Sequence, residues 1–156
     1  FINNKLELYI FNHYVTGVSK VKFDLNNLSM NAHDTRYGTH LKMKKSDFKK
    51  QTGNYPEYFN KMFGKDKTEK IDKQIKDLFK YLKTQIKVEC YKESENCFKY
   101  FGADIMVTDK FVIKMLEIND NPGSIFNIFT KYKTAFYKGM FNIILKNKVS
   151  KHFTKC

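Results

Sequence analysis

Two apolar segments in the middle of the chain restrict its possible folds to those that contain a β-hairpin. Residues 98–107 and 111–118 are rich in aromatic and β-branched side chains, and the turn-like residues 108–110 separate them. This pattern is typical of two antiparallel strands. If an even-length loop joins them, residues an odd number of positions apart share a face, because side chains alternate along each strand.

Three oxygen-bearing side chains are therefore predicted to lie on one face of the hairpin. Asp104 and Glu117 are 13 positions apart, and Asn119 lies two positions beyond Glu117. Carboxylate and amide oxygens suit Mg²⁺, which also keeps positions open for water and phosphate. The pattern indicates a metal site formed by these three residues, with Glu117 and Asp104 as the candidate catalytic residues. The alternative, that the acids are only the solvated face of a half-covered sheet, stays open on this pattern alone.

The sequence around these residues resembles that of a known family. It reads Phe101-Gly102-x-Asp104 and then Glu117-x-Asn119-x-x-Pro122. At this separation the two motifs resemble the closing signature of the tubulin–tyrosine ligase-like family. Earlier in the chain, residues 24–31 read D-L-N-N-L-S-M-N and resemble the family's H-L-T-N-Y-S-x-N segment.

The resemblance implies an ATP-grasp fold, here an α+β domain with an antiparallel sheet packed with helices. It also implies a ligase that uses ATP and Mg²⁺ to join a free amino acid to a protein carboxylate through an acylphosphate. By the same resemblance, Asn27 is the candidate for contacting nucleotide phosphate or acceptor, and Asn119 is a further nucleotide-binding candidate. Asn26 is a weaker candidate, because it stands where the family has a hydroxyl. The implied acceptor is an acidic protein tail such as that of tubulin.

The resemblance covers only the C-terminal portion of an ATP-grasp ligase domain, which we assign to residues 1–147, with 148–156 expected to fray. The family's upstream nucleotide-clamping lysine has no counterpart here, so residues 1–156 alone are expected to show no ligase turnover. This chain also departs from the family's Y-R-E-G-x-x-R motif, since residues 9–12 read Y-I-F-N and lack the arginines. That change favours a second hypothesis, a non-catalytic member that binds microtubules or another acidic partner.

The formal net charge of +13 attracts polyanions of any kind. Of the 29 basic residues only Arg36 is an arginine, and no nucleic-acid-binding motif is present. A lysine-rich nucleic-acid binder is therefore the third and least favoured hypothesis. The sequence has no apolar run long enough to span a membrane. Three cysteines, an odd number, favour a reducing compartment, and the expected location is the cytoplasm, with cytoskeletal association as an option.

The other expected elements follow from periodicity and turn residues. Residues 5–11 and 15–23 predict a second antiparallel hairpin, whereas 32–60 predict a long irregular segment. Apolar side chains spaced by three and four predict a helix over 65–87. A terminal helix is expected from about 125 to 146, which would place its N-terminus near the metal ligands, where it favours phosphate.

Overall fold

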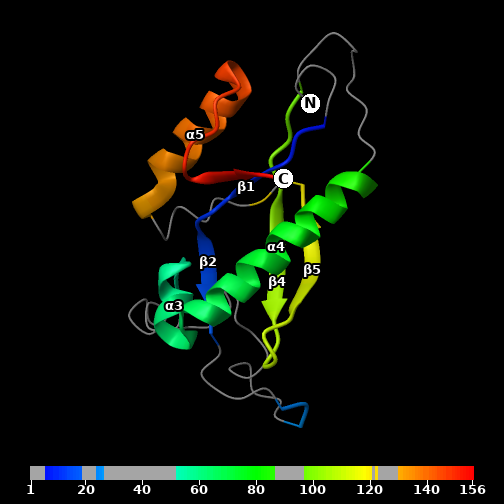
Figure 1. Ribbon diagram of the computed structural model, residues 1–156, viewed down its shortest axis with the longest axis vertical. Helices are drawn as coiled ribbons and strands as arrows, with labels where there is room; N and C mark the ends of the chain where they lie inside the picture. Colours follow the sequence, from blue (N-terminus) through cyan, green and yellow to red (C-terminus); the bar gives the residue numbers. More distant parts are fainter. Residues whose placement is uncertain (1–5, 19–23, 27–51, 87–96, 121, 123–129) are drawn as a thin grey trace.

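The structure, a computed structural model, describes residues 6–18, 24–26, 52–86, 97–120, 122 and 130–156. In chain order the elements are β1 (Tyr9–Phe11), β2 (Tyr14–Gly17), β3 (Thr52–Tyr55), α3 (Glu57–Phe63), α4 (Lys65–Gln85), β4 (Gly102–Val107), β5 (Ile113–Asn119), the 3₁₀ turn η2 (Thr130–Tyr132), α5 (Lys133–Lys146) and β6 (Phe153–Lys155). Their strands form three antiparallel pairs, β1–β6, β2–β3 and β4–β5 (Figure 1). The chain is therefore an α+β protein, as predicted.

The predicted N-terminal hairpin is wrong, because β1 and β2 do not pair with each other. Instead Ile10 lies opposite Thr154 of β6, and Val15 lies opposite Asn54 of β3. Only Asn12 and His13 separate the two strands, and both side chains form hydrogen bonds with the C-terminal segment. The Nδ2 of Asn12 donates a hydrogen bond to the Lys151 carbonyl at 3.3 Å. The Nε2 of His13 lies 3.0 Å from the Nδ1 of His152, and the two nitrogens share a hydrogen bond. These contacts tie the short link between the two strands to the C-terminal segment, where a tight turn was expected.

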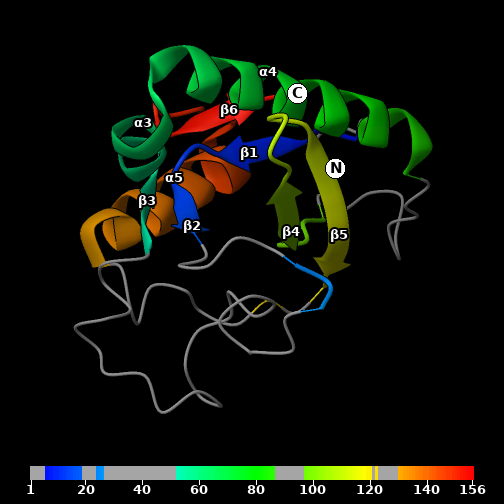
Figure 2. The ribbon, with the colours of Figure 1, turned by 90° about the horizontal axis from the view of Figure 1, so that it is seen from below.

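Helix α4 covers one face of the β4–β5 hairpin and forms the main core. Its apolar stripe confirms the predicted helix, and Ile71 and Ile75 are buried against Tyr55 and Phe59. Side chains of the hairpin pack on the same cluster, namely Ile105, Val107, Phe111 and Ile113. Figure 2 shows α4 lying across one side of β4 and β5.

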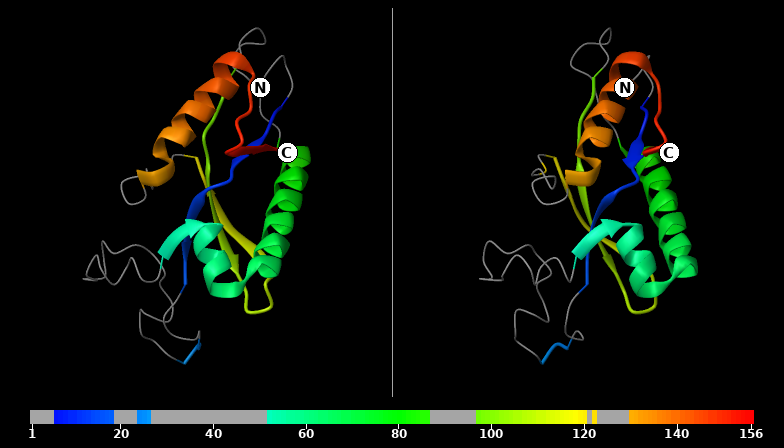
Figure 3. Two further views of the ribbon diagram at one scale, coloured as in Figure 1. Left: turned by 60° about the vertical axis from the view of Figure 1, so that its left-hand side comes forward. Right: turned by 90° about the vertical axis from the view of Figure 1, so that its left-hand side faces the viewer.

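A second apolar cluster joins α5 to the two ends of the chain. The Phe136 ring lies 5.0 Å from Phe11 and 6.0 Å from Phe153, measured between ring centroids. Figure 3 shows α5 on the opposite side of β1 from α4. The expected frayed tail is therefore wrong at residues 153–155, which form β6, because Phe153 buries its ring against α5 and β1.

Two of the three cysteines lie among the described residues. Cys97 is disulfide-bonded to a partner outside the described residues, whereas Cys156 is a free thiol. Among the described residues, no helix has the length and apolar content needed to cross a membrane.

Candidate metal centre

A β-bulge sets which residues face each other on the β4–β5 hairpin. Near the turn, Val107 pairs with Ile113 and Ile105 with Met115, whereas beyond them Asp104 pairs with Glu117. Leu116 is thus the extra residue of the bulge. The loop of residues 108–112 has an odd length, so the even-length loop assumed from the sequence is wrong. The bulge compensates, because without it Asp104 would face Leu116 and Glu117 would point to the other face.

The bulge brings the three predicted ligands together on one face. Asp104 and Glu117 are directly opposed, and Asn119 follows on the same face, where its Nδ2 donates to Glu117 Oε1 at 3.0 Å. This hydrogen bond leaves the Asn119 carbonyl oxygen as an acceptor-type ligand. Partial burial, and after it the neighbouring Glu117 carboxylate, raise the pKa of Asp104. The site therefore concentrates negative charge that an added cation would relieve.

Helix α4 holds the hairpin from behind, so that the carboxylates face away from the core. Asp104 is exposed, whereas the next residue, Ile105, packs on the core cluster. At the turn, Gln74 of α4 donates to the Phe111 carbonyl at 2.9 Å and accepts from the Ile113 N–H at 3.2 Å. Because Gln74 uses both ends of its amide, the hairpin is anchored to α4 at its turn end.

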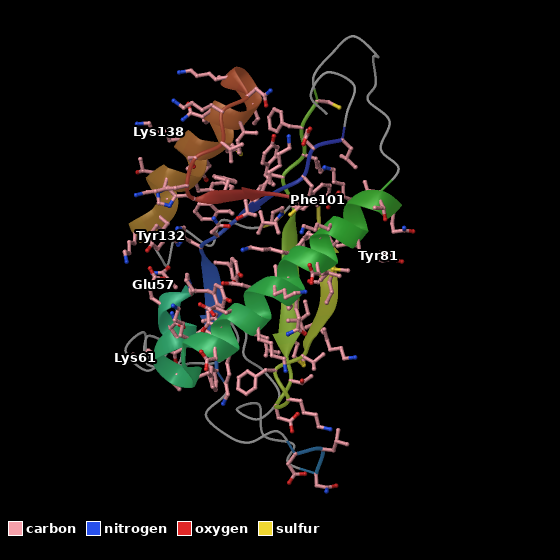
Figure 4. All side chains as sticks on the ribbon, in the orientation of Figure 1. Glu57, Lys61, Tyr81, Phe101, Tyr132 and Lys138 are labelled. Carbon is pink, nitrogen blue, oxygen red and sulfur yellow. The ribbon has the colours of Figure 1, made fainter. Side chains whose placement is uncertain are left out.

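Gly102 and Pro122 close the other end of the hairpin, beside the ligands. Gly102 pairs with Asn119, and a Cβ added to Gly102 would lie 2.7 Å from the Pro122 Cβ and 3.9 Å from the Asn119 Cβ. Only a residue without a side chain allows proline to approach the strand this closely. Sequence reasoning used these two residues as a motif but missed their contact. Phe101, which precedes them, is exposed at the start of β4 (Figure 4).

The residues present suit Mg²⁺ better than a metal ion whose ligands all come from protein side chains. Among the described residues, no group of three or more histidine, cysteine or acidic side chains is arranged around a common metal position. The hairpin offers two carboxylates and one amide, all oxygen donors. Such a set fits an ion that binds through one or two carboxylates and completes its shell with water and phosphate.

Of the two upstream positions predicted to bind ligand, the structure describes only Asn26. Asn27 lies outside the described residues. Asn26 is exposed, and its N–H donates to Asp24 Oδ1 at 2.9 Å. In Figure 1 residues 24–26 lie beyond the turn of the hairpin, whereas in the strand register Asp104 and Glu117 pair on the side of the bulge away from the turn. The helix start expected near residue 125 lies outside the described residues, and in the described part η2 precedes α5, which begins at Lys133.

The structure also assembles a polar cluster that the sequence did not reveal. The His13 ring stacks on Tyr132 with centroids 3.7 Å apart, and the Tyr132 hydroxyl donates to Glu57. Figure 4 shows Tyr132 and Glu57 adjacent in the view, at the junction of η2 and α3. These long-range contacts partly bury His13.

The chain matches one known protein family. A sequence model described as the tubulin-tyrosine ligase family matches residues 1–155, and the chain belongs to this family. Membership suggests a ligase-type function. No significant match was found among curated proteins or among solved structures.

Proposed function

We propose that the chain forms the C-terminal part of an ATP-grasp ligase that adds an amino acid to a protein carboxylate. The observation that carries the proposal is the direct opposition of Asp104 and Glu117 beside Asn119 on one exposed face. Family membership supplies the reaction class. The acceptor is an acidic protein tail, of which tubulin is the example implied by the family name, and the location is the cytoplasm.

The proposed reaction has two steps. The acceptor carboxylate attacks the γ-phosphorus of ATP, which gives an acylphosphate and ADP. The amine of the incoming amino acid then attacks the acyl carbon, forms the amide, and releases inorganic phosphate. Bound Mg²⁺ would neutralise the negative charge that develops on the phosphate during transfer.

The residues of this chain contribute position and charge. Glu117 and Asp104 would hold the ion through carboxylate oxygens, and Asn119 would add its amide oxygen while its NH₂ orients Glu117. Glu117 is central, because a single carboxylate has two oxygens and can serve two ions. Asn27 and Asn26 stay candidates for contacts with nucleotide or acceptor.

The test is Mg²⁺-dependent ATP binding, measured by isothermal titration calorimetry. We expect Glu117→Gln to abolish the Mg²⁺-dependent part, because the substitution removes a negative ligand without changing shape. Asp109→Asn is the matched control, since Asp109 is an exposed acid at the turn of the same hairpin. Unchanged ATP binding in Glu117→Gln would contradict the assignment.

A second function is favoured by what replaces the family's arginines. Ile10 stands where the family's motif has its first arginine, and it packs on the core cluster. This position is therefore built into the apolar core. The second candidate is a basic, non-catalytic protein that binds an acidic partner such as the microtubule surface. It predicts salt-sensitive binding to a glutamate-rich peptide that is unchanged by Glu117→Gln.

A further inference from the structure

A cavity lies on a part of the molecule that the candidate metal centre does not use. Its volume is about 260 Å³, and it lies between β1, α4 and the C-terminal segment that includes β6. Asp104, Glu117 and Asn119 are not among its lining residues. The apolar part of the lining includes Ile10 and Ile75, which belong to the core or pack against it.

Hydrogen bonds fix the polar walls of this cavity. On the α4 side, the Tyr55 hydroxyl donates to Asp72 Oδ1 at 2.6 Å. On the β1 side, the Thr154 hydroxyl donates to Asn12 Oδ1 at 2.8 Å. Walls held in this way are preformed, so a ligand would not have to order them on binding.

The charged groups of the lining favour an anion. Lys76 and Lys151 both line the cavity, and within the described residues neither ammonium has a carboxylate partner. Asp72 also lines it, but its carboxylate already accepts the Tyr55 hydrogen bond. The two lysines therefore leave the lining with a net positive charge.

His13 supplies a further unsatisfied group at the same place. Burial is the largest cause that lowers the pKa of His13, and the nearby Glu57 raises it whereas His152 and Lys131 lower it, so the net effect favours the neutral ring. Its Nδ1 is buried and has no hydrogen-bond partner among the described residues. A buried polar atom without a partner calls for an explanation, and a bound ion or water is a common one.

We propose that this cavity is a binding site for a small oxyanion, of the size of inorganic phosphate or a short carboxylate. The anion would lie between the Lys76 and Lys151 ammonium groups, with Asn12 as a neutral donor beside them. Its negative charge would stabilise protonated His13, so binding and His13 protonation would be coupled.

The test titrates the protein with inorganic phosphate and, separately, with succinate, while histidine ring signals are followed by NMR. We expect saturable binding of at least one probe, with a Kd on the order of 1 mM or tighter, and an upward shift of the His13 titration. The probe that binds identifies the phosphate or carboxylate chemistry.

Three variants separate a built site from general charge. Lys76→Met with Lys151→Met should weaken binding about tenfold or more, because hydrogen bonds from charged donors are lost. The corresponding double arginine variant should bind, and Lys80→Met should bind like the unchanged protein, since Lys80 lies one turn further along α4 and does not line the cavity. Absence of saturation with both probes, or equal weakening by Lys80→Met, would overturn the proposal.

Discussion

The opposed carboxylates predict that the candidate metal centre is a source of instability when no cation is present. Asp104 and Glu117 face each other directly across the β4–β5 pair. Like charges in this position destabilise a sheet by roughly 0.2–1 kcal/mol. Both side chains are exposed, so solvent screening places the cost at about 0.5 kcal/mol or less. Replacing Glu117 with glutamine should therefore stabilise the metal-free protein by about that amount.

The expected shift in melting temperature follows from the size of the chain. For a chain of 156 residues, 1 kcal/mol corresponds to about 2–4 °C, so Glu117→Gln should raise the Tm by roughly 1–2 °C. Differential scanning calorimetry at pH 7 in low salt measures this shift. The gain should shrink in 1 M salt, because the repulsion is screened.

The raised pKa of Asp104 determines how the stability gain of Glu117→Gln changes with pH. Since the pKa of Asp104 is raised in the folded state, the folded protein holds this proton more tightly than the unfolded chain. Stability contributed by this group therefore falls as pH rises from about 4 through the raised pKa. The advantage of Glu117→Gln should be present at pH 7 and should vanish near pH 3, where Asp104 is protonated in both states.

Adding Mg²⁺ should reverse the order of stability. The unchanged protein gains stability by binding the ion in the folded state alone, whereas Glu117→Gln does not. The reasoning is refuted if the variant is less stable than the unchanged protein without Mg²⁺ in low salt. It is also refuted if Mg²⁺ raises both melting temperatures equally while Asp109→Asn behaves like the unchanged protein.

Three further predictions concern the supports of the fold. Gly102→Ala should cost about 1–3 kcal/mol in urea denaturation, because its Cβ would lie 2.7 Å from the Pro122 Cβ. Tyr55→Phe should cost about 1–3 kcal/mol by the same assay, since it leaves Asp72 without its 2.6 Å hydrogen bond. His13 has a lowered pKa, so stability should decline as pH falls below about 6.5, and His13→Gln should flatten that decline in a Tm series.

Matched variants separate these effects from general damage. Adding Pro122→Gly to Gly102→Ala should recover part of the loss, because it removes the Cβ that clashes. Tyr81→Phe should leave stability unchanged, as Tyr81 is 62% exposed. No recovery in the double variant, an equal loss in Tyr81→Phe, or superimposable pH curves for His13→Gln would each contradict the corresponding prediction.

The parts of the fold that the sequence predicted correctly are local in the chain. Helix α4 and the β4–β5 hairpin each come from a continuous periodic segment, so their side-chain pattern is visible without tertiary contacts. The shared face of Asp104 and Glu117 was also predicted, although for an incomplete reason. The parity argument assumed an even loop, whereas an odd loop and the Leu116 bulge together give the same face.

The parts that the sequence missed depend on distant partners. Strand β1 pairs with β6 at the other end of the chain, and no short-range pattern encodes that pairing. Residues 52–55 were expected to be irregular because Gly53 and Pro56 are turn residues, yet they form β3 beside β2. Tyr55 in this segment is a buried core residue. The sequence did not reveal it, because the residues around it in the chain are polar and rich in lysine.

The most direct measurement is the paramagnetic effect of Mn²⁺, a substitute for Mg²⁺, on backbone amide NMR signals. If the hairpin holds the ion, signals of residues 102–104 and 117–119 broaden first as Mn²⁺ is added, and excess Mg²⁺ restores them. The same titration of Asp104→Asn with Glu117→Gln leaves those signals sharp. Broadening that is strongest elsewhere, or equal in the double variant, would contradict a metal centre formed by Asp104, Glu117 and Asn119.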